Sequence, residues 1–325
     1  MARSDLLLDL VRAGRVGDQE RLRRVAEALI AEERAKGHSV LADRLERSLR
    51  QDGLPPAPTA RNGEPAIDGL VYEVSPKRRL DEVILDQSAM DICREVVEEH
   101  ARAELLRSYN LEPRHRVLLM GPPGNGKTTL AEALAYELLL PLYVVRYEGV
   151  IASYLGETAS RIARLFDFVR TRQCVLFFDE FDAVAKERGD PHDTGEVKRV
   201  VSSLLLQIDA LPSHVVVITA SNHPELLDRA VWRRFEVRLT LGKPTPGQRA
   251  EFLSRLFSNI RANLPISVAG IVKDLAGVSF SEIEEFAVGV QRKVILAGSD
   301  SNVRAILRQS RREWKQRAKA QASGT

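Results

Sequence analysis

The stretch that decides the fold is RVLLMGPPGNGKTTLAEALAYEL, residues 116–138. An apolar run comes first, a segment rich in helix formers comes last, and the motif residues between them are Gly121, Gly126, Lys127 and Thr128. This is G-x-x-x-x-G-K-[ST] in the context that it requires, after a strand and before a helix. The glycines let the backbone turn its N–H groups towards a polyphosphate, and the positive end of the helix faces the same anion. The stretch therefore predicts a phosphate-binding loop rather than a chance glycine-rich turn.

Acidic and amide side chains end two further apolar runs. VLFFDE ends in Asp179 and Glu180, and VVVITASN ends in Asn222. An acid at the carboxyl end of a parallel strand faces the ligand crevice of an open α/β sheet. We expect Lys127 to meet the β- and γ-phosphates of ATP, and Thr128 and Asp179 to hold Mg²⁺. Glu180 is placed to polarise the attacking water as a general base and Asn222 to orient that water, although alone such residues are often only turn formers.

Around these motifs, short apolar runs alternate with longer helical segments. This alternation is typical of an α/β fold in which crossover helices join the strands of a parallel sheet. After Pro244 the strands stop and stretches such as GQRAEFLSRLFSNI follow, which predicts a small helical lid. The sequence thus predicts a large α/β domain at residues 70–242 and a lid domain with a basic C-terminal helix at residues 243–325. The predicted strands are residues 117–120, 142–147, 174–178, 215–219 and 237–241.

The N-terminal region lacks strand patterns. Residues 1–51 carry apolar side chains at helical spacing, for example Leu22, Val25 and Leu29, and predict an all-helical module. Residues 52–69 hold four prolines and three glycines without periodicity, which is typical of a flexible linker. So short a helical piece buries only a small core. It is either a module that binds a partner or substrate, which we favour, or a segment ordered only by the main domain.

Composition bounds the class of protein. Of the 325 residues, 44% are hydrophobic and 29% charged, which excludes a collagenous or wholly disordered chain. The net charge of +3 is too small for a surface that binds nucleic acid throughout. The longest apolar stretch, residues 138–145, is far shorter than the roughly 20 residues that cross a bilayer. Cys93 and Cys174 form no disulfide or metal pattern. We expect a cytoplasmic protein without a membrane partner.

The three motifs together resemble the AAA family of ATPases within the AAA+ superfamily, over about residues 78–290. GPPGNGKTT resembles the Walker A loop of that family, VLFFDEFDAVAKERG its Walker B segment, and ITASNHPELLDRAVWRRFEVRL its second region of homology. The resemblance is to the branch with katanin, spastin and proteasomal motors, and it implies Mg²⁺-dependent hydrolysis of ATP to ADP and phosphate. A single Walker set implies a single-ring protein of bacterial type. By resemblance, the ATP-binding residues are Gly121, Pro123, Gly124, Asn125, Gly126, Lys127, Thr128 and Thr129.

The resemblance also implies roles for three further side chains. Asn222 is then the sensor residue, and Arg233 and Arg234 are arginine fingers that reach the nucleotide of the neighbouring subunit. A finger supplied in trans accelerates hydrolysis by about 10³- to 10⁵-fold. A monomer then lacks part of its own site, so a nucleotide-dependent homo-oligomer, a hexamer in this family, is expected. The alternative is that both arginines are surface charges at a helix end.

GVIASYLGETASRI lies between the second and third predicted strands and resembles the pore loop of family members that thread their substrate. Its aromatic, hydrophobic and glycine residues are Tyr154, Leu155 and Gly156. An aromatic beside an aliphatic side chain grips extended polypeptide by apolar contact and stacking, without reading its sequence. The alternative is a tyrosine packed under a loop. Residues 186–196 occupy the place of the family's second pore loop.

The sequence departs from the family pattern at three places. Asn125 stands where threonine is common, a small polar exchange that leaves the backbone cradle intact. In GVSFSEIEEF, Phe280 and Ser281 replace the Gly-Ala pair with which the lid approaches the nucleotide. In LDEVILD, Leu85 replaces an expected glycine beside the adenine. The base and ribose contacts are therefore expected to differ, and the candidates for the adenine contact are Val83 and Ile84.

Two functions of different classes follow. The first is an ATP-driven unfoldase whose ring threads polypeptide through a pore and whose N-terminal helices recruit substrate, an adaptor or a separate protease. Without an H-E-x-x-H or G-x-S-x-G motif, proteolysis would come from that partner. The alternative is a nucleic-acid-acting loader or plasmid-maintenance ATPase, which only the basic run near the C-terminus supports. We favour the first, because such runs are commonly solvated faces or subunit contacts. A scaffold without turnover is disfavoured by the presence of Glu180 and both arginines.

Overall fold

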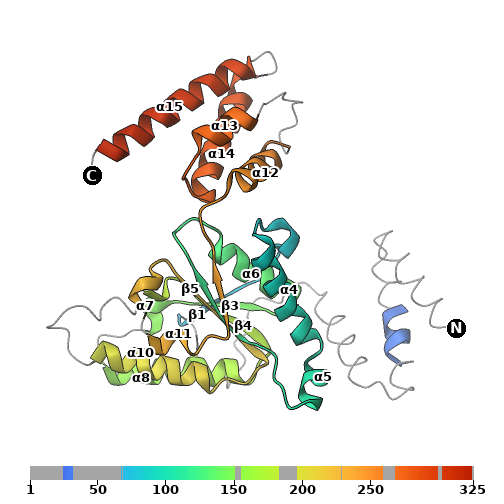
Figure 1. Ribbon diagram of the computed structural model, residues 1–325. Coiled ribbons are helices and arrows are strands. Elements are labelled where there is room, and N and C mark those ends of the chain that lie inside the picture. Colours follow the sequence, from blue (N-terminus) through green and yellow to red (C-terminus); the bar gives the residue numbers. More distant parts are fainter. Residues whose placement is uncertain are drawn as a thin grey trace. The chain divides into compact units, whose positions relative to one another are not determined.

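The computed structural model describes residues 25–31, 67, 69–150, 155–182, 196–227, 229–258, 268–298 and 302–323 (Figure 1). The chain divides into two units, residues 1–64 and 65–325. In the first unit, residues 25–31 are helical and bury Ala26, Leu29 and Ile30. The rest of the predicted N-terminal module and most of the predicted linker lie outside the described residues, so both stay predictions.

The second unit contains a sheet of six strands in its described part. They are β1 (Val71–Val74), β2 (Arg116–Met120), β3 (Leu142–Val145), β4 (Cys174–Phe178), β5 (Val215–Ser221) and β6 (Val237–Thr240), in the order β1-β3-β4-β5-β2-β6. The five predicted strands are present and run parallel. The sequence pattern does not predict β1, which pairs antiparallel with β3 and makes the sheet mixed rather than wholly parallel. As an edge strand of four partly accessible residues, β1 needs no continuous apolar run.

Helices cover both faces of this sheet. They are α4 (Gln87–Ala101), α6 (Lys127–Glu137), α8 (Leu155–Arg170) and α10 (Glu196–Asp209). In β4, Val175 and Phe177 pack with α4 and α6, whereas Leu176 and Phe178 pack with α8 and α10, because successive side chains point to opposite faces. Figure 1 shows α8 and α10 together on one side. Every residue of β4 and β5 is buried, which is why these strands read as unbroken apolar runs.

A separate helical cluster follows β6 and confirms the predicted lid. Its helices are α12 (Pro246–Ser258), α13 (Val268–Asp274), α14 (Phe280–Ala297) and α15 (Val303–Ser323). Leu253, Ile271 and Ile283 are among the side chains of its buried core. A capping box between Ser279 and Glu282 begins α14. Phe280 and Ser281 therefore form the first turn of that helix.

Shorter elements complete the described chain. They are η1 (Leu80–Glu82), α5 (Ala103–Ser108), α7 (Tyr147–Val150), η3 (Pro224–Leu226) and α11 (Arg229–Trp232). Because β4, β5 and β2 are neighbours and parallel, the residues that follow their carboxyl ends meet at one edge of the sheet. No helix in the described ranges is both long enough and apolar enough to span a bilayer.

Candidate nucleotide-binding and hydrolysis site

Glycines shape the loop after β2. Gly121 has a φ of +135°, and a Cβ atom there would lie 2.1 Å from the carbonyl oxygen of Leu241, so no larger residue fits. Gly124 and Gly126 also have positive φ, and Gly126 directly precedes α6. The first N–H groups of α6 have no partner within the helix, and the helix dipole adds positive potential at the same place. This geometry suits an anion at the N-terminus of α6.

Lys127 is the first residue of α6 and is buried, with 6% of its surface exposed. Its Nζ donates to the carbonyl oxygens of Gly121 at 2.7 Å and Pro122 at 3.0 Å. Burial lowers the pKa of Lys127, and the carboxylates that follow β4 act in the opposite direction. The loop's own carbonyl groups therefore hold the ammonium group at the phosphate loop, where it can neutralise phosphate charge.

The two predicted magnesium ligands lie together. Thr128 Oγ1 donates to Asp179 Oδ2 at 2.8 Å, although the residues belong to α6 and to the end of β4. Asp179 Oδ1 accepts the backbone N–H of Glu180 at 3.0 Å. A hydroxyl and a carboxylate beside a phosphate loop are the kind of oxygen donors that Mg²⁺ uses together with nucleotide phosphates and water. The residues present therefore fit Mg²⁺ with ATP.

The lid contacts the phosphate loop through the start of α14. The backbone N–H of Ser281 donates to the carbonyl oxygen of Gly124 at 3.0 Å, and the N–H of Phe280 donates to Asn125 Oδ1 at 3.4 Å. The Nδ2 of the buried Asn125 has no hydrogen-bond partner among the described residues, so a donor remains for a phosphate oxygen. The Phe280 ring packs edge-on against Phe252 of α12. Two of the three departures from the family pattern, Asn125 and the Phe280–Ser281 pair, thus lie at the loop itself.

Glu180, the predicted general base, has a φ of +50°. A residue other than glycine in this left-handed region costs on the order of 1–3 kcal/mol, and such residues cluster at functional sites. The side chain is exposed, whereas Asp179 beside it is half-buried. The turn after β4 therefore separates two adjacent acids, one held against Thr128 and one facing solvent.

Asn222, the predicted sensor, follows β5 and is held by a residue that sequence reasoning missed. Its backbone N–H donates to Asp182 Oδ1 at 2.9 Å, and Asp182 is buried with 6% exposed. The signal in the sequence is the last acid of DEFD, two residues after Glu180. Asp182 therefore joins the segment after β4 to the segment after β5.

The two predicted arginine fingers differ in their surroundings. Arg234 Nε donates to Asp209 Oδ2 at 2.6 Å, and the same carboxylate pairs with Arg116 at 3.3 Å. Arg116 also pairs with Glu236 at 2.7 Å. Arg233 is exposed beyond the end of α11. Of the pair, Arg234 is engaged within its own chain, whereas Arg233 is accessible to a neighbour.

The remaining predicted site residues lie in varied places. Pro123 is exposed, and Thr129 is half-buried in the first turn of α6. Val83 is buried beside η1, which Arg255 of α12 contacts through the carbonyl oxygen of Glu82 at 2.9 Å. Leu155 and Gly156 begin α8. Tyr154 and nearly all of the predicted second pore loop, residues 186–196, lie outside the described residues.

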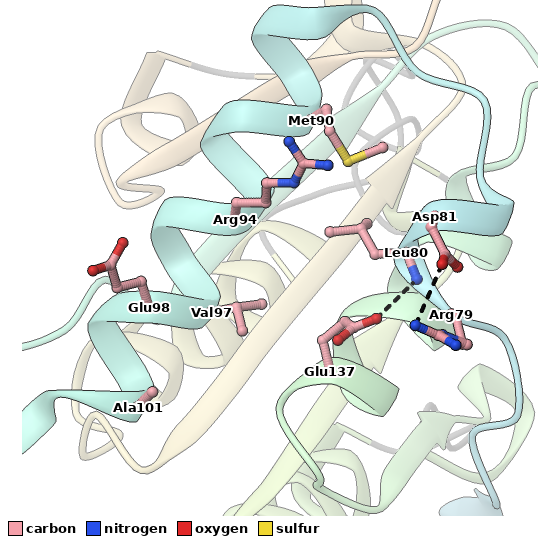
Figure 2. Close-up of a pocket in the computed structure, with 9 residues that line it drawn as sticks. All are labelled: Arg79, Leu80, Asp81, Met90, Arg94, Val97, Glu98, Ala101 and Glu137. Carbon is pink, nitrogen blue, oxygen red and sulfur yellow. Dashed lines mark hydrogen bonds and ion pairs between the residues drawn. The ribbon is translucent and has the colours of Figure 1, made fainter.

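A hollow of about 280 Å³ lies between α4, η1 and the end of α6 (Figure 2). Glu137 accepts the backbone N–H of Leu80 at 3.1 Å across it, and Arg79 pairs with Asp81 at 3.3 Å. None of its lining residues belongs to the phosphate loop or to the segments after β4 and β5. Its lining holds two arginines against three acids, so it offers no surplus positive charge to an anion. The nucleotide chemistry therefore belongs to the loop after β2 and not to this hollow.

Comparisons with known proteins identify the family. The sequence profile of the ATPase family associated with various cellular activities (AAA) matches residues 117–243, from β2 to just beyond β6. The uncharacterized AAA family ATPase y4kL of Sinorhizobium fredii is 38% identical over 303 residues, which cover 91% of this chain and 90% of that relative. The chain therefore belongs to the AAA family of ATPases, and its enzymatic activity is the hydrolysis of ATP.

Two further similarities bear on class and fold. A protein of Methanothermobacter marburgensis, named as a homolog of 26S proteasome regulatory subunits, is 34% identical over 217 residues, which cover 66% of this chain and 58% of that relative. The crystal structure of the FIGL-1 AAA domain in complex with ADP matches with a TM-score of 0.58 and 24% identity, over 75% of this chain and 84% of that chain. The second similarity shows the fold alone.

Proposed function

We propose that this protein remodels other proteins by threading polypeptide through the central pore of a homo-oligomeric ring, a hexamer. The proposal rests on the strand from which the segment that leads to Tyr154 begins. The segment follows β3, which pairs in parallel with β4, the strand that bears Asp179 and Glu180. A change at these acids during hydrolysis is therefore one strand away from the base of the proposed pore loop. The relative named as a proteasome regulatory subunit homolog supports the same class of function.

In this proposal the chain's own residues divide the work of hydrolysis. Bound Mg²⁺ would neutralise charge that develops on the phosphates. Lys127 and the N–H groups of the loop hold the phosphates, and Asp179 with the hydroxyl of Thr128 holds the metal. Glu180 accepts a proton from the attacking water, and the amide of Asn222 orients that water. An arginine of the neighbouring subunit supplies the remaining positive charge.

The proposed substrate is polypeptide rather than nucleic acid. Two of the basic residues of α15, Arg311 and Lys315, pair with Asp274 of α13, so part of the basic run serves the packing of the lid. The N-terminal helices are proposed to recruit substrate, an adaptor or a separate protease.

A trapping experiment tests threading. Glu180→Gln should keep ATP and Mg²⁺ bound while slowing hydrolysis, so that a threaded polypeptide stays in the ring. We expect polypeptides to co-purify with this variant from the native cell in the presence of ATP, as identified by mass spectrometry. Adding Tyr154→Ala should remove them, because the apolar grip is lost, whereas adding Tyr154→Phe should retain them. Enriched nucleic acid, or the same protein set with alanine at this position, would count against threading.

A further inference from the structure

The first turn of α14 lies directly on the phosphate loop. The carbonyl oxygen of Gly124 accepts two hydrogen bonds from Ser281, one from its N–H at 3.0 Å and one from its Oγ at 3.2 Å. The N–H of Phe280 donates to Asn125 Oδ1 at 3.4 Å. Through these three bonds, the lid contacts the two loop residues that precede Gly126 and α6.

The lid also fits closely against Gly124. A Cβ atom at this residue would lie 3.0 Å from both Ser279 Oγ and Ser281 Oγ and 3.1 Å from Ser281 Cβ. Gly124 has a φ of +75°, a conformation that glycine adopts without strain. On the lid side, Ser279 is fixed as the N-cap of α14 by reciprocal bonds with Glu282. A preformed helix start therefore meets a loop position that suits only glycine.

The bonds at Gly124 fix the orientation of one peptide group of the loop. The C=O of Gly124 and the N–H of Asn125 belong to the same planar trans peptide, in which the two groups point in opposite directions. Because Ser281 holds the carbonyl oxygen, the N–H of Asn125 is directed away from α14. Glycine permits many backbone conformations, so this peptide group can rotate unless something holds it. Loop N–H groups are what such a loop offers to a phosphate.

The side chain of Asn125 gives the lid a second hold on the same peptide group. Only its amide oxygen can accept the N–H of Phe280, which settles the direction in which the buried amide faces. The N–H groups in the first turn of a helix have no partner within that helix. The contact therefore satisfies polar groups of both the loop and the lid.

We infer that Ser281 and Asn125 are positioning residues for nucleotide binding, through which the lid holds the phosphate loop in the conformation that receives phosphate. Docking of the lid then raises the affinity for nucleotide, and by thermodynamic reciprocity bound nucleotide tightens the lid on the loop. The inference goes beyond threading and does not depend on it. It does require that the loop bind nucleotide, which Lys127→Ala tests separately: unchanged ADP affinity in that variant would remove the loop assignment and this inference with it.

Phe280→Pro tests the lid bond, because it removes the N–H that Asn125 accepts. Proline suits the first residue of a helix, and Ser279 before it is extended, with a ψ of 167°. The matched variant is Phe280→Leu, which also lacks the ring that packs on Phe252 but keeps the N–H. We expect ADP with Mg²⁺ to bind Phe280→Pro about three- to ten-fold more weakly than Phe280→Leu, the effect of one hydrogen bond. Isothermal titration calorimetry measures both dissociation constants, and equal values would overturn the inference.

A double-mutant cycle separates the lid bond from a direct contact of Asn125 with phosphate. Asn125→Ala should cost less ADP affinity in the Phe280→Pro background than in the Phe280→Leu background, because in the former the lid bond is already absent. The same loss in both backgrounds would show that Asn125 acts on the nucleotide without the lid, which contradicts the inference.

Hydrogen exchange of backbone amides follows the bonds themselves and does not need the proline substitution. In wild type, ADP should slow the exchange of the Phe280 and Ser281 amides, because bound nucleotide tightens the lid on the loop. In Asn125→Ala, the slowing at Phe280 should be smaller by about three- to ten-fold, because its acceptor is gone. If these bonds served only the fold of the lid, both amides would exchange equally fast with and without ADP, and the inference would fail.

Discussion

At the scale of single residues, Asp182 links two strands of the site through one hydrogen bond. It comes from the segment after β4 and accepts the N–H of Asn222 after β5. Electrostatic stabilisation of a transition state depends on groups that are already in place when charge develops. A buried carboxylate on the backbone of Asn222, the predicted sensor, would supply that constraint.

Asp182→Ala should therefore impair turnover more than ATP binding. It leaves a partly buried N–H without its acceptor, a loss of on the order of 1 kcal/mol or more, and we expect kcat to fall about ten-fold with little change in KM. Asp182→Asn keeps an acceptor oxygen at the same place and should retain most of the activity. Steady-state ATPase assays at saturating ATP measure both variants. Equal kcat values for wild type and Asp182→Ala would show that Asn222 needs no such support.

Residue types and spacing alone could indicate Lys127, Thr128, Asp179 and Glu180, because the rules that place them are local. Asp182 could not be found in this way. Its contact with Asn222 depends on which strands are neighbours, since β4 lies beside β5 only in the folded sheet. The spacing of residues within a single motif does not indicate which strands are neighbours in the sheet.

At the scale of secondary-structure elements, the burial of a strand decides whether its sequence predicts it. The strands β2 to β5 are largely buried and read as apolar runs, and the edge strand β6 alternates buried and exposed residues, so all five could be predicted. The strand β1 escapes because its four residues include no buried one and do not alternate. In the lid, Asp274 at the end of α13 pairs with Arg311 and Lys315 of α15, and its side chain is only 10% exposed. Two helices of the lid are therefore joined by one carboxylate.

This ion pair should make the stability of the lid depend on pH. Burial by itself raises the pKa of Asp274, but the two cations outweigh it and hold that pKa below its ordinary value. A depressed pKa in the folded state stabilises above the unfolded pKa of about 3.9, and that contribution is lost as the pH falls through the lower folded value. We expect Asp274→Asn to lower Tm at pH 7 and the difference from wild type to shrink below about pH 4.

Thermal denaturation of both proteins at pH 7 and at pH 3 measures this difference. Glu285→Gln is the matched control, because its exposed pair with Arg317, at 3.6 Å, should contribute little. A loss of Tm in Asp274→Asn that is the same at both pH values would assign the effect to packing and not to charge.

At the scale of the whole molecule, the two arginines after α11 bear on assembly. Arg234 is bonded to Asp209 of its own chain, whereas Arg233 is exposed. If Arg233 completes the site of a neighbour, a chain that lacks it has an intact general base but gives nothing to the next subunit. A chain that lacks Glu180 has the opposite defect.

Mixing these two defects should restore activity. Arg233→Ala and Glu180→Gln are each expected to bind ATP with turnover reduced by about 10³-fold or more. Equimolar mixtures should hydrolyse ATP faster than the sum of the separate proteins, because some sites combine an intact Glu180 with an intact Arg233. Wild-type turnover per subunit should also rise with protein concentration. Additive rates in the mixtures would place the finger in its own chain or remove it from catalysis.

The close approach of Gly121 to Leu241 has a mechanical meaning. Leu241 follows β6, donates its N–H to the carbonyl oxygen of Met120 at 2.7 Å, and leads within a few residues into α12. The strand β6, which leads into the lid, therefore ends against Gly121, the first residue of the phosphate loop. We therefore expect a small displacement of the loop to be passed on as a rotation of the lid, whose last helix, α15, is 21 residues or about 30 Å long. A side chain at residue 121 would therefore disturb the contact with Leu241 as well as the phosphate loop.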